Sequence, residues 1–294
     1  MSFTRRFIDV TFFGGKYGTI TFNSRGKYAL RTSARILRAG GYNQSELQLE
    51  IRGLSLQHIN QLSTYGTVIH PNYNYKIKVD AGDDINGMST VFVGNIQQAW
   101  ADMKAMPDCP FHVIATVQGD AATMKADPTS FSGPTEAETM LQQLAGTANL
   151  GFRNFGLKAK LADPYFWGSP WKQMKEILDA ANGDGIIENG VLNVWPQDGK
   201  TDGNLVISPG TGLRDYPSFT QYGVQVRYEF HKNIPYRSTM TIEGSQIEQA
   251  NGTWTIIRID YDLQSNTPHG QWFAIIDGWD PKNAASGVGG PPIP

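Results

Sequence analysis

Alternating apolar and polar residues dominate the last quarter of the chain and predict antiparallel strands there. Residues 253–263 are rich in β-branched and aromatic side chains, and the polar turn at 266–270 separates them from a second such run at 271–277. Two runs around a Pro/Gly turn are typical of paired antiparallel strands. A third run at 239–243 precedes them and alternates more plainly. Residues 239–278 are therefore predicted to form a three-stranded unit.

The same order of segments occurs earlier in the chain. A short alternating strand is expected at 75–80, a longer one at 90–97, and a final one at 111–119 after a Pro-marked loop. This order predicts that residues 75–119 and 239–278 are matching units of two related β-modules, although they share little residue identity. The alternative is that two unrelated meanders happen to share this simple order.

The rest of the first 120 residues is also predicted to be mostly strand. We expect strands at residues 7–13, 19–22, 34–37 and 46–51. Within the last of these, Leu47, Leu49 and Ile51 share one face. Ser55 is suited to cap a short helix that runs to Tyr65, with Gly66 at its end. This region therefore reads as a small β-barrel or sandwich that carries one helix.

The middle of the chain changes to a mixed helix and strand pattern. Thr135 and Glu138 have capping-box spacing ahead of an apolar helical stripe, and a second helix is expected from Ser169-Pro170. Short strands are expected at 151–153, 157–161, 186–188 and 191–195. Asn189-Gly190 joins the last two and favours a type I′ turn, which needs positive φ at both residues. Residues 130–200 are thus predicted to form an insert of order α-β-β-α-β-β, and another strand is expected at 223–230.

Composition narrows the possible functions. The 294 residues include 25 basic and 27 acidic side chains, for a net charge of −2, and no long run of either sign occurs. A nucleic-acid groove needs clustered Lys and Arg, so this distribution argues against one. The single cysteine, Cys109, excludes an intrachain disulfide. With no signal-like segment and no stretch long enough to span a bilayer, we expect a soluble protein made in the cytoplasm.

No catalytic, cofactor or metal site is predicted. The histidines lack zinc-site spacing, and they are His58, His70, His112, His231 and His269. Residues 80–87 resemble a calcium loop but lack the alternating ligands and the terminal Glu. Glu136 and Glu138 lie in a first helical turn, where carboxylates favour the macrodipole, so we assign them to capping rather than to glycoside cleavage.

The seven tryptophans leave two interpretations open. Five lie in or beside periodic segments, which favours a place in the core. The alternative is a sugar-binding face.

Several segments resemble a known family. Residues 51–54, 59–66 and 91–96 are similar to the first barrel of baseplate hub proteins from contractile-tailed bacteriophages. Residues 212–217 and 245–254 are similar to the second barrel of that family. The resemblance implies a homotrimer in which two tube-like barrels per chain make a pseudo-sixfold ring. Such a ring would adapt a hexameric tail tube to a trimeric central spike. No lysozyme-like segment is present, so cell-wall hydrolysis is not implied.

The resemblance, combined with the patterns above, defines the expected organisation. The fold class is α+β, predominantly antiparallel β, with two small related β-barrels and an inserted α/β domain. The expected ranges are 1–125 for the first barrel with its helix, 126–204 for the insert, 205–279 for the second barrel and 280–294 for a flexible tail.

The expected function is that of a non-enzymatic virion protein at the tail tip, assembled in the host cytoplasm. Its implied partners are two further copies of itself, the tail tube protein, the central spike protein and other baseplate proteins, with DNA passing through but not specifically bound. The alternatives are a carbohydrate-binding β-module attached to an α/β domain, or an enzyme whose site is assembled from scattered residues.

A ring through which DNA passes should not have a basic lining, because Lys and Arg would hold the phosphates. We therefore expect polar and acidic side chains on strand positions that face the channel. The candidates are Gln97, Gln118, Glu243, Asp260 and Asp262. The alternative is that these are ordinary solvent-facing residues.

Overall fold

Most strands of the chain belong to one antiparallel sheet. The structure, a computed structural model, describes residues 4–26, 29–40, 45–64, 75–220 and 223–280. The first half of the chain contributes β1 (Arg6–Gly15), β2 (Gly18–Phe22), β3 (Arg31–Ala39), β4 (Glu46–Arg52), β5 (Lys76–Asp83), β6 (Gly87–Ala101) and β7 (Pro110–Thr116). The last part contributes β15 (Asn204–Ile207), β16 (Ser218–Thr220), β17 (Gly223–Glu229), β18 (Thr239–Ile242), β19 (Gly252–Ser265) and β20 (Trp272–Trp279).

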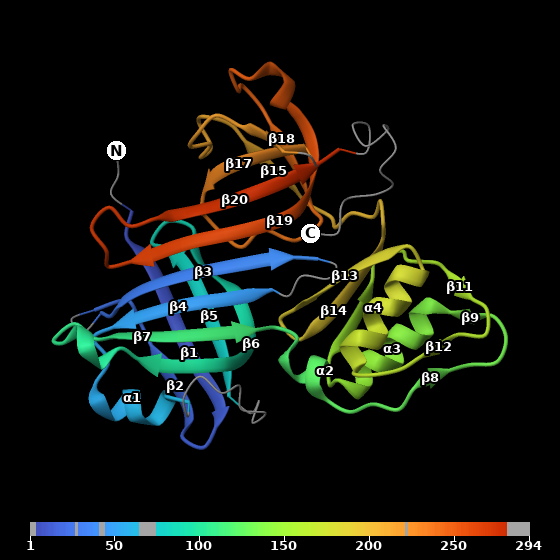
Figure 1. Cartoon of the computed structure of the whole chain (residues 1–294). Helices are drawn as coiled ribbons and strands as arrows, with labels where there is room; N and C mark the ends of the chain where they lie inside the picture. The colour runs from blue at the N-terminus through green and yellow to red at the C-terminus, as the bar shows by residue number, and fades with distance from the viewer. Residues whose placement is uncertain (1–3, 27–28, 41–44, 65–74, 221–222, 281–294) are drawn as a thin grey trace.

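Pairing between β3 and β19 joins the two sets of strands. The register runs from Thr32 opposite Ser265 to Ala39 opposite Arg258. The strand order is β16-β17-β20-β19-β3-β4-β7-β6-β5-β1-β2, and β18 and β15 branch from β19. Figure 1 shows β20, β19, β3, β4 and β7 side by side in this order. One hydrophobic core contains buried side chains from both halves, among them Ile36, Ile51, Val226 and Trp272.

The predicted strands are confirmed, but no closed barrel is found. Hydrogen bonding among the described residues leaves the strand order open at β16 and at β2. The two halves are instead parts of one continuous sheet. The sequence patterns missed β15 and β16 because each is too short to show alternation.

The two units that the sequence predicted to match have the same connectivity and register. In the first unit Lys76, Asn95 and Thr116 lie opposite one another on β5, β6 and β7. In the second unit Thr239, Thr255 and Trp279 do so on β18, β19 and β20. A β-bulge follows at the same place in both, between Ile96 and Gln98 and between Ile256 and Arg258. Because a bulge shifts every later side chain, its shared place favours a duplication over chance.

The short helix of the first half begins as predicted. The Ser55 hydroxyl accepts a hydrogen bond from the His58 N–H at the start of α1 (Leu56–Leu62). The expected extension to Tyr65 and Gly66 lies outside the described residues. Two short 3-10 helices, η1 (Met103–Ala105) and η2 (Glu248–Ala250), also occur, one in each of the two matching units.

The mixed segment has a hydrophobic core of its own. Helices α3 (Ala137–Thr147) and α4 (Pro170–Ala180) contribute its largest buried stripes. Beside them lies a sheet of order β10-β14-β13, formed by β10 (Gly151–Asn154), β13 (Gly183–Glu188) and β14 (Val191–Pro196). Smaller elements complete the segment: α2 (Gly119–Thr123), β8 (Thr129–Ser130), β9 (Thr135–Glu136), β11 (Lys160–Leu161) and β12 (Tyr165–Phe166). The strand expected at 157–161 is thus reduced to the two residues of β11, which pair with β9.

The capping predictions for these helices had different outcomes. Ser169 caps α4, since its hydroxyl accepts from the Lys172 N–H. The capping box at α3 was wrong, because Glu136 is the N-cap and makes no side-chain cap hydrogen bond. Thr135 instead lies in β9, where its hydroxyl donates to the Gly133 carbonyl. The extended backbone of β9 therefore takes the place of the expected cap.

Two buried ion pairs attach β13 to the rest of the protein. Arg237 Nη2 lies 2.6 Å from Asp184 Oδ2, and the Tyr236 hydroxyl donates to the same oxygen at 3.1 Å. Burial and the charge of Asp184 both raise the pKa of the Tyr236 hydroxyl, which therefore stays protonated and donates. At the end of β13, Glu188 pairs with Arg38 of β3, which is itself buried. These contacts fix β13 against both halves of the main sheet.

The turn between β13 and β14 is the two-residue turn that the sequence predicted. Asn189 and Gly190 have φ values of 49° and 77°, and Glu188 lies opposite Val191. Gly190→Val should lower the free energy of unfolding by about 1 kcal/mol or more, because β-branched residues avoid positive φ. Chemical denaturation followed by tryptophan fluorescence measures this. Gly190→Asn, which tolerates positive φ, is the matched control and should cost less. Equal stability of the Val variant and the native chain would contradict this account of the turn.

Candidate functional site

One face of the continuous sheet points away from the hydrophobic core, and we call it the outer face. On β3, β4 and β7 it carries Ser33, Arg35, Leu37, Glu46, Gln48, Glu50, His112 and Ile114. On β17, β19 and β20 it carries Gln225, Arg227, Arg258, Asp260, Asp262, Gln264, Phe273, Ile275 and Asp277. Gln98 and Trp100 of β6 continue it beyond β7. Because β3 pairs with β19, this largely polar face crosses from one half to the other without a break.

The centre of the outer face is an ion-paired group on β3 and β19. Arg35 Nη2 lies 2.9 Å from Asp260 Oδ2, and Arg35 Nε donates to Asp260 Oδ1 at 3.4 Å. Arg35 is exposed and covers Asp260, whose side chain is mostly buried. Asp262 lies directly opposite Arg35 in the strand register. One guanidinium therefore stands against two carboxylates where the two halves meet.

A second arginine is held by polar and aromatic partners on the β17 side. Arg227 donates from Nη2 to Gln271 Oε1 at 2.7 Å and pairs with Asp215 at 3.3 Å. Its guanidinium carbon lies 4.0 Å from the centroid of the Phe273 ring, which is a cation–π contact. Beside it, Gln225 donates to Asp277 at 2.7 Å. The positive charge here is already engaged by groups of the protein.

The β4–β7–β6 side of the outer face carries an aromatic stack. The rings of Trp100 and His112 lie 5.3 Å apart at 29°, and Trp100 is 39% exposed. Glu50 lies next to His112 and accepts from Arg52 Nε at 2.7 Å. Arg52 also pairs with Asp108 at 3.0 Å. Charges of both signs are again paired here. Farther along the sheet, β5 adds Lys76 and Lys78 to the same face, and Lys78 pairs with Asp80 at 2.9 Å.

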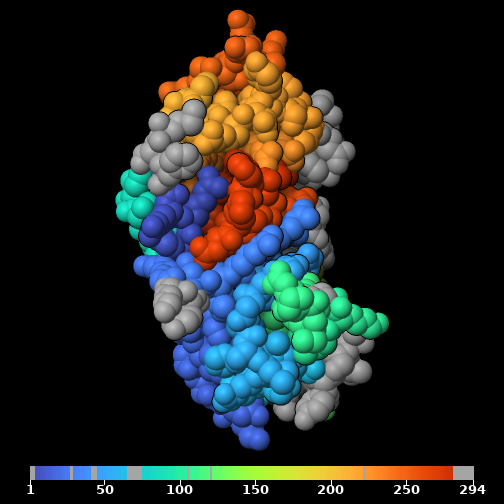
Figure 2. Space-filling view, turned by 90° about the vertical axis from the view of Figure 1, so that its left-hand side faces the viewer, coloured from blue at the N-terminus to red at the C-terminus, as the bar shows by residue number. Residues whose placement is uncertain are grey.

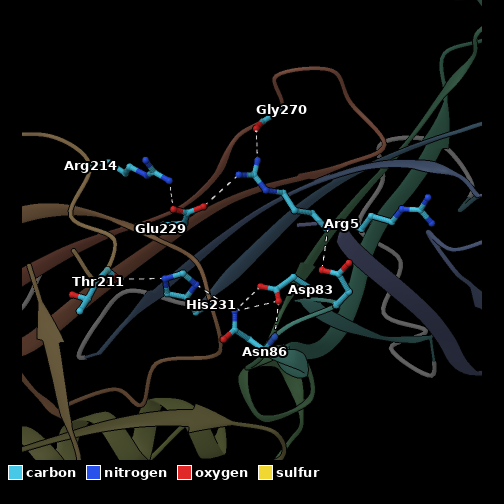
Figure 3. Close-up of polar contacts among 10 residues, drawn as sticks. Arg5, Asp83, Asn86, Thr211, Arg214, Glu229, His231 and Gly270 are labelled. Atoms are coloured by element: carbon cyan, nitrogen blue, oxygen red, sulfur yellow. Dashed lines mark hydrogen bonds and ion pairs between the residues drawn. The ribbon is translucent and has the colours of Figure 1, made fainter. Parts of the chain in front are cut away.

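A polar network connects the two halves at a different place, where β1 and the β5–β6 turn meet the end of β17 (Figure 3). Arg6 pairs with Glu229 at 3.5 Å and donates to the Gly270 carbonyl at 3.1 Å. Glu229 also pairs with Arg214. Figure 2 shows the red β19–β20 segment between blue segments of the first half and gold segments of the second. The first junction thus joins the two halves through the β3–β19 backbone pairing and the Arg35–Asp260 ion pair. The second junction joins them through the Arg6–Glu229 ion pair.

His231 extends this network to the turn that resembled a calcium loop. Its Nε2 lies 3.3 Å from the Thr211 carbonyl, which can only accept, so Nε2 donates. Nδ1 lies 3.5 Å from Asn86 Nδ2 and accepts in the neutral ring. Asn86 donates in turn to Asp83. Burial raises the pKa of Asp83, but hydrogen bonds from Asn86 and Ile85 outweigh it and hold that pKa below its usual value. The Asp83 carboxylate thus stabilises the turn between β5 and β6 by accepting hydrogen bonds from Ile85 and Asn86.

The five candidate channel residues occupy four different environments. Asp260 and Asp262 lie together on the outer face. Gln97 is half-buried at the β6 bulge and donates to Thr116 Oγ1 at 2.8 Å. Gln118 is 1% exposed, and its amide has no hydrogen-bond partner within the described residues. Glu243 is exposed beyond the end of β18. The structure thus brings together only two of the five.

Arg35 and Arg227 were not identified from the sequence. Both occupy polar positions of predicted strands, at 34–37 and 223–230, but nothing near them in the sequence reveals their partners. Arg35 is 225 residues from Asp260. The β3–β19 register would have been needed to place Arg35, and the β17–β20 register to place Arg227.

The described residues contain no group of three His, Cys, Asp or Glu side chains able to hold a metal ion. None of their helices is long and apolar enough to cross a membrane. Five tryptophans are buried as expected, namely Trp171, Trp195, Trp254, Trp272 and Trp279. Trp100 and Trp167 are exposed and do not lie together in a single strand or helix.

Solved structures share this fold along almost the whole chain. The prophage MuSo2 43 kDa tail protein from Shewanella oneidensis is 9% identical with a TM-score of 0.63, and the match covers 94% of this chain and 99% of that one. A tail protein from Neisseria meningitidis MC58 is 10% identical with a TM-score of 0.61, covering 93% and 96%. The prophage tail protein gp18 from Listeria monocytogenes EGD-e is 8% identical with a TM-score of 0.51, covering 93% and 94%. The fold is therefore that of phage tail proteins.

The sequence itself gives the family. The family described as Baseplate hub gp41 matches residues 18–275, whereas no curated protein sequence matches the chain. The chain belongs to the baseplate hub gp41 family. It is a structural protein of the phage tail and a component of the virion, as the resemblance in the sequence implied.

Asp262 provides a test of the electrostatics of the outer face. Burial raises the pKa of its carboxyl, and although Arg35 and Arg227 oppose this, the charge of Asp260 adds to it. A carboxyl with a raised folded-state pKa lowers stability as pH rises from the unfolded value, about 3.9, through the folded one. Asp262→Asn should therefore raise the melting temperature relative to the native chain at pH 7. This difference should disappear when both are measured below about pH 3.9. Glu243→Gln, at an exposed position, is the control, and a pH-independent difference for Asp262→Asn would contradict the burial argument.

Proposed function

We propose that this chain forms a homotrimeric baseplate hub that connects a hexameric tail tube to a trimeric central spike and surrounds part of the channel for DNA ejection. The observation that carries this proposal is the pair of register-matched meanders joined in one sheet. Three copies would present six similar units to the tube and three complete chains to the spike. A duplicated unit therefore suits a change from sixfold to threefold symmetry.

The outer face suits the lining of such a channel. Two of the arginines defined on this face, Arg35 and Arg227, are engaged by Asp260, Asp215 and Gln271. The third, Arg258, lies opposite Asp277 in the strand register. Arginines held in this way have less positive charge available for phosphates, and DNA bound by fewer contacts releases fewer counterions and moves more freely. The acidic candidates Asp260 and Asp262 fit this role by position. Gln97, Gln118 and Glu243 fit it less well, since they lie at the bulge, in the interior and beyond β18.

The protein would act without catalysis, through contacts with the tail tube protein, the central spike protein and other baseplate proteins. It would assemble in the host cytoplasm and remain in the virion. By this proposal residues 1–125 and 205–279 form the two tube-like modules and 126–204 the insert. The carbohydrate-binding alternative is not favoured, because five of the seven tryptophans are buried and the two exposed ones, Trp100 and Trp167, do not lie in one strand or helix.

The oligomeric state tests the proposal directly. Light scattering of the purified protein should give about three times the chain mass of 32.4 kDa, and negative-stain images should show rings with a central opening. If the trimer needs its neighbours, mixing with tail tube and spike proteins should give a larger complex that contains three copies of this chain, as native mass spectrometry would count. A monomer or dimer under all these conditions would refute the proposal.

The channel lining is tested by reversing charge on the outer face. Phage assembled with the double variant Asp262→Lys and Glu46→Lys should release DNA more slowly, because added cations would hold the phosphates. The defect should shrink as salt is raised. The double variant Glu138→Lys and Asp198→Lys adds the same charge at two exposed positions of the mixed segment and serves as the matched control. Particles of normal assembly and normal release kinetics with the double variant would argue against DNA passing along this face.

A further inference from the structure

We propose that β16 of one copy adds as an antiparallel strand to the C-terminal part of β6 of the next copy, with Thr220 opposite Trp100 and Phe219 opposite Ala101. The proposal rests on the trimer proposed above and names the surfaces through which its copies join. It follows from how this chain already pairs its own two halves.

The match between the two halves extends beyond the three-stranded units. In the first half β4 pairs with β7, placing Glu46 opposite Thr116, and β3 pairs with β4, placing Leu37 opposite Glu46. In the second half β17 pairs with β20, placing Gly223 opposite Trp279, and β16 pairs with β17, placing Thr220 opposite Gly223. Since Thr116 corresponds to Trp279, β16 corresponds to β3 and Thr220 to Leu37.

Strand β3 pairs with a second strand, β19, whereas β16 pairs with β17 alone among the strands of the described residues. Leu37 lies opposite Asp260 of β19, two residues after Arg258, which is the first paired residue beyond the β19 bulge. In β6 the first paired residue beyond the bulge is Gln98, and the residue two positions after it is Trp100. If each half joins the next half in the same way around the ring, Thr220 meets Trp100 of a second copy. A head-to-tail ring requires such a contact between two different surfaces of the same chain.

The β16 edge is exposed where β3 is covered. Within the described residues β16 pairs only with β17. Phe219 lies opposite the fully buried Val224 and so belongs to the core side of the sheet, yet it is 54% exposed. Its counterpart in β3 is Ile36, which is fully buried against β19. An exposed aromatic side chain on the core side of an edge strand indicates that another strand pairs there in the assembly. At the corresponding position of β3, that strand is β19.

The C-terminal part of β6 has backbone groups available for a strand of this length. Thr64 already bonds to Ala99, whose N–H donates to Thr64 Oγ1 at 3.0 Å. The Asp102 N–H donates to the Pro110 carbonyl, toward β7. Alternation therefore directs the N–H and C=O of Ala101 away from β7, to the side of Thr64. With Thr64 beside Ala99, residues 100–102 have no strand partner on this side within the described part of the chain, and this length equals the three residues of β16.

Disulfide trapping in the full chain tests this register. In a Cys109→Ser background, Thr220→Cys is combined with Trp100→Cys, and the protein is oxidised and run on non-reducing gels. Facing residues of an antiparallel pair have Cα atoms about 4.5–5.5 Å apart, within the range of a disulfide. We expect covalent dimers and trimers that return to single chains on reduction. Phe219→Cys with Ala101→Cys is a second pair in the same register and covers the case in which the first variant misfolds.

The matched control keeps the strands and the face but changes the register. Ser218→Cys with Gln98→Cys places the two thiols four residues out of register, about 13 Å apart. It should cross-link at about one tenth or less of the matched yield, since a disulfide cannot span that distance. A trimer by light scattering without cross-linking of either matched pair would overturn this inference and leave the proposed hub intact. Equal yields from matched and control pairs would also overturn it. A native chain that never trimerises would instead remove the proposed function itself.

Discussion

Pairing between β3 and β19 is the contact on which the rest of the structure depends. It places residues more than two hundred positions apart in one ladder and makes two meanders into one sheet. The shared core and the continuous outer face both follow from it. An antiparallel ladder fixes register strictly when one face is buried, because a shift of one residue would turn every side chain over. Arg35 therefore meets Asp260 by the same register that buries Ile36 and Tyr261.

The sequence predicted the local elements of the fold but not how they meet. Richness in β-branched and aromatic residues identified the long strand β19, because such side chains fit a pleated sheet surface. Asn189-Gly190 defined its turn because backbone sterics act within two residues. Thr135 failed as a cap because its segment pairs with β11, a tertiary contact that outweighs capping propensity. Local sequence patterns thus predict the structure correctly where interactions between neighbouring residues determine it.

The candidate surface shows the same limit more strongly. Asp260 and Asp262 could be selected as polar positions of a predicted strand, and the structure keeps them together on the outer face. Gln118 follows an equally convincing strand but turns into the interior at the start of α2. Alternation could not have shown that the Gln118 amide is buried without a hydrogen-bond partner among the described residues. Membership of a surface depends on which strands are neighbours, and that information is spread over the whole chain.

The ionic attachment of β13 has a mechanical consequence. Apolar interfaces can slide by small steps, since their attraction has little direction. Asp184 and Glu188 instead hold Arg237 and Arg38 through directed, partly or fully buried contacts at two separate points. Two such anchors resist rotation as well as separation, because displaced charges would be left without their partners in a poorly solvated site. A force applied to α3 and α4 would therefore turn the main sheet with them, so that the mixed segment and the sheet move as one rigid body.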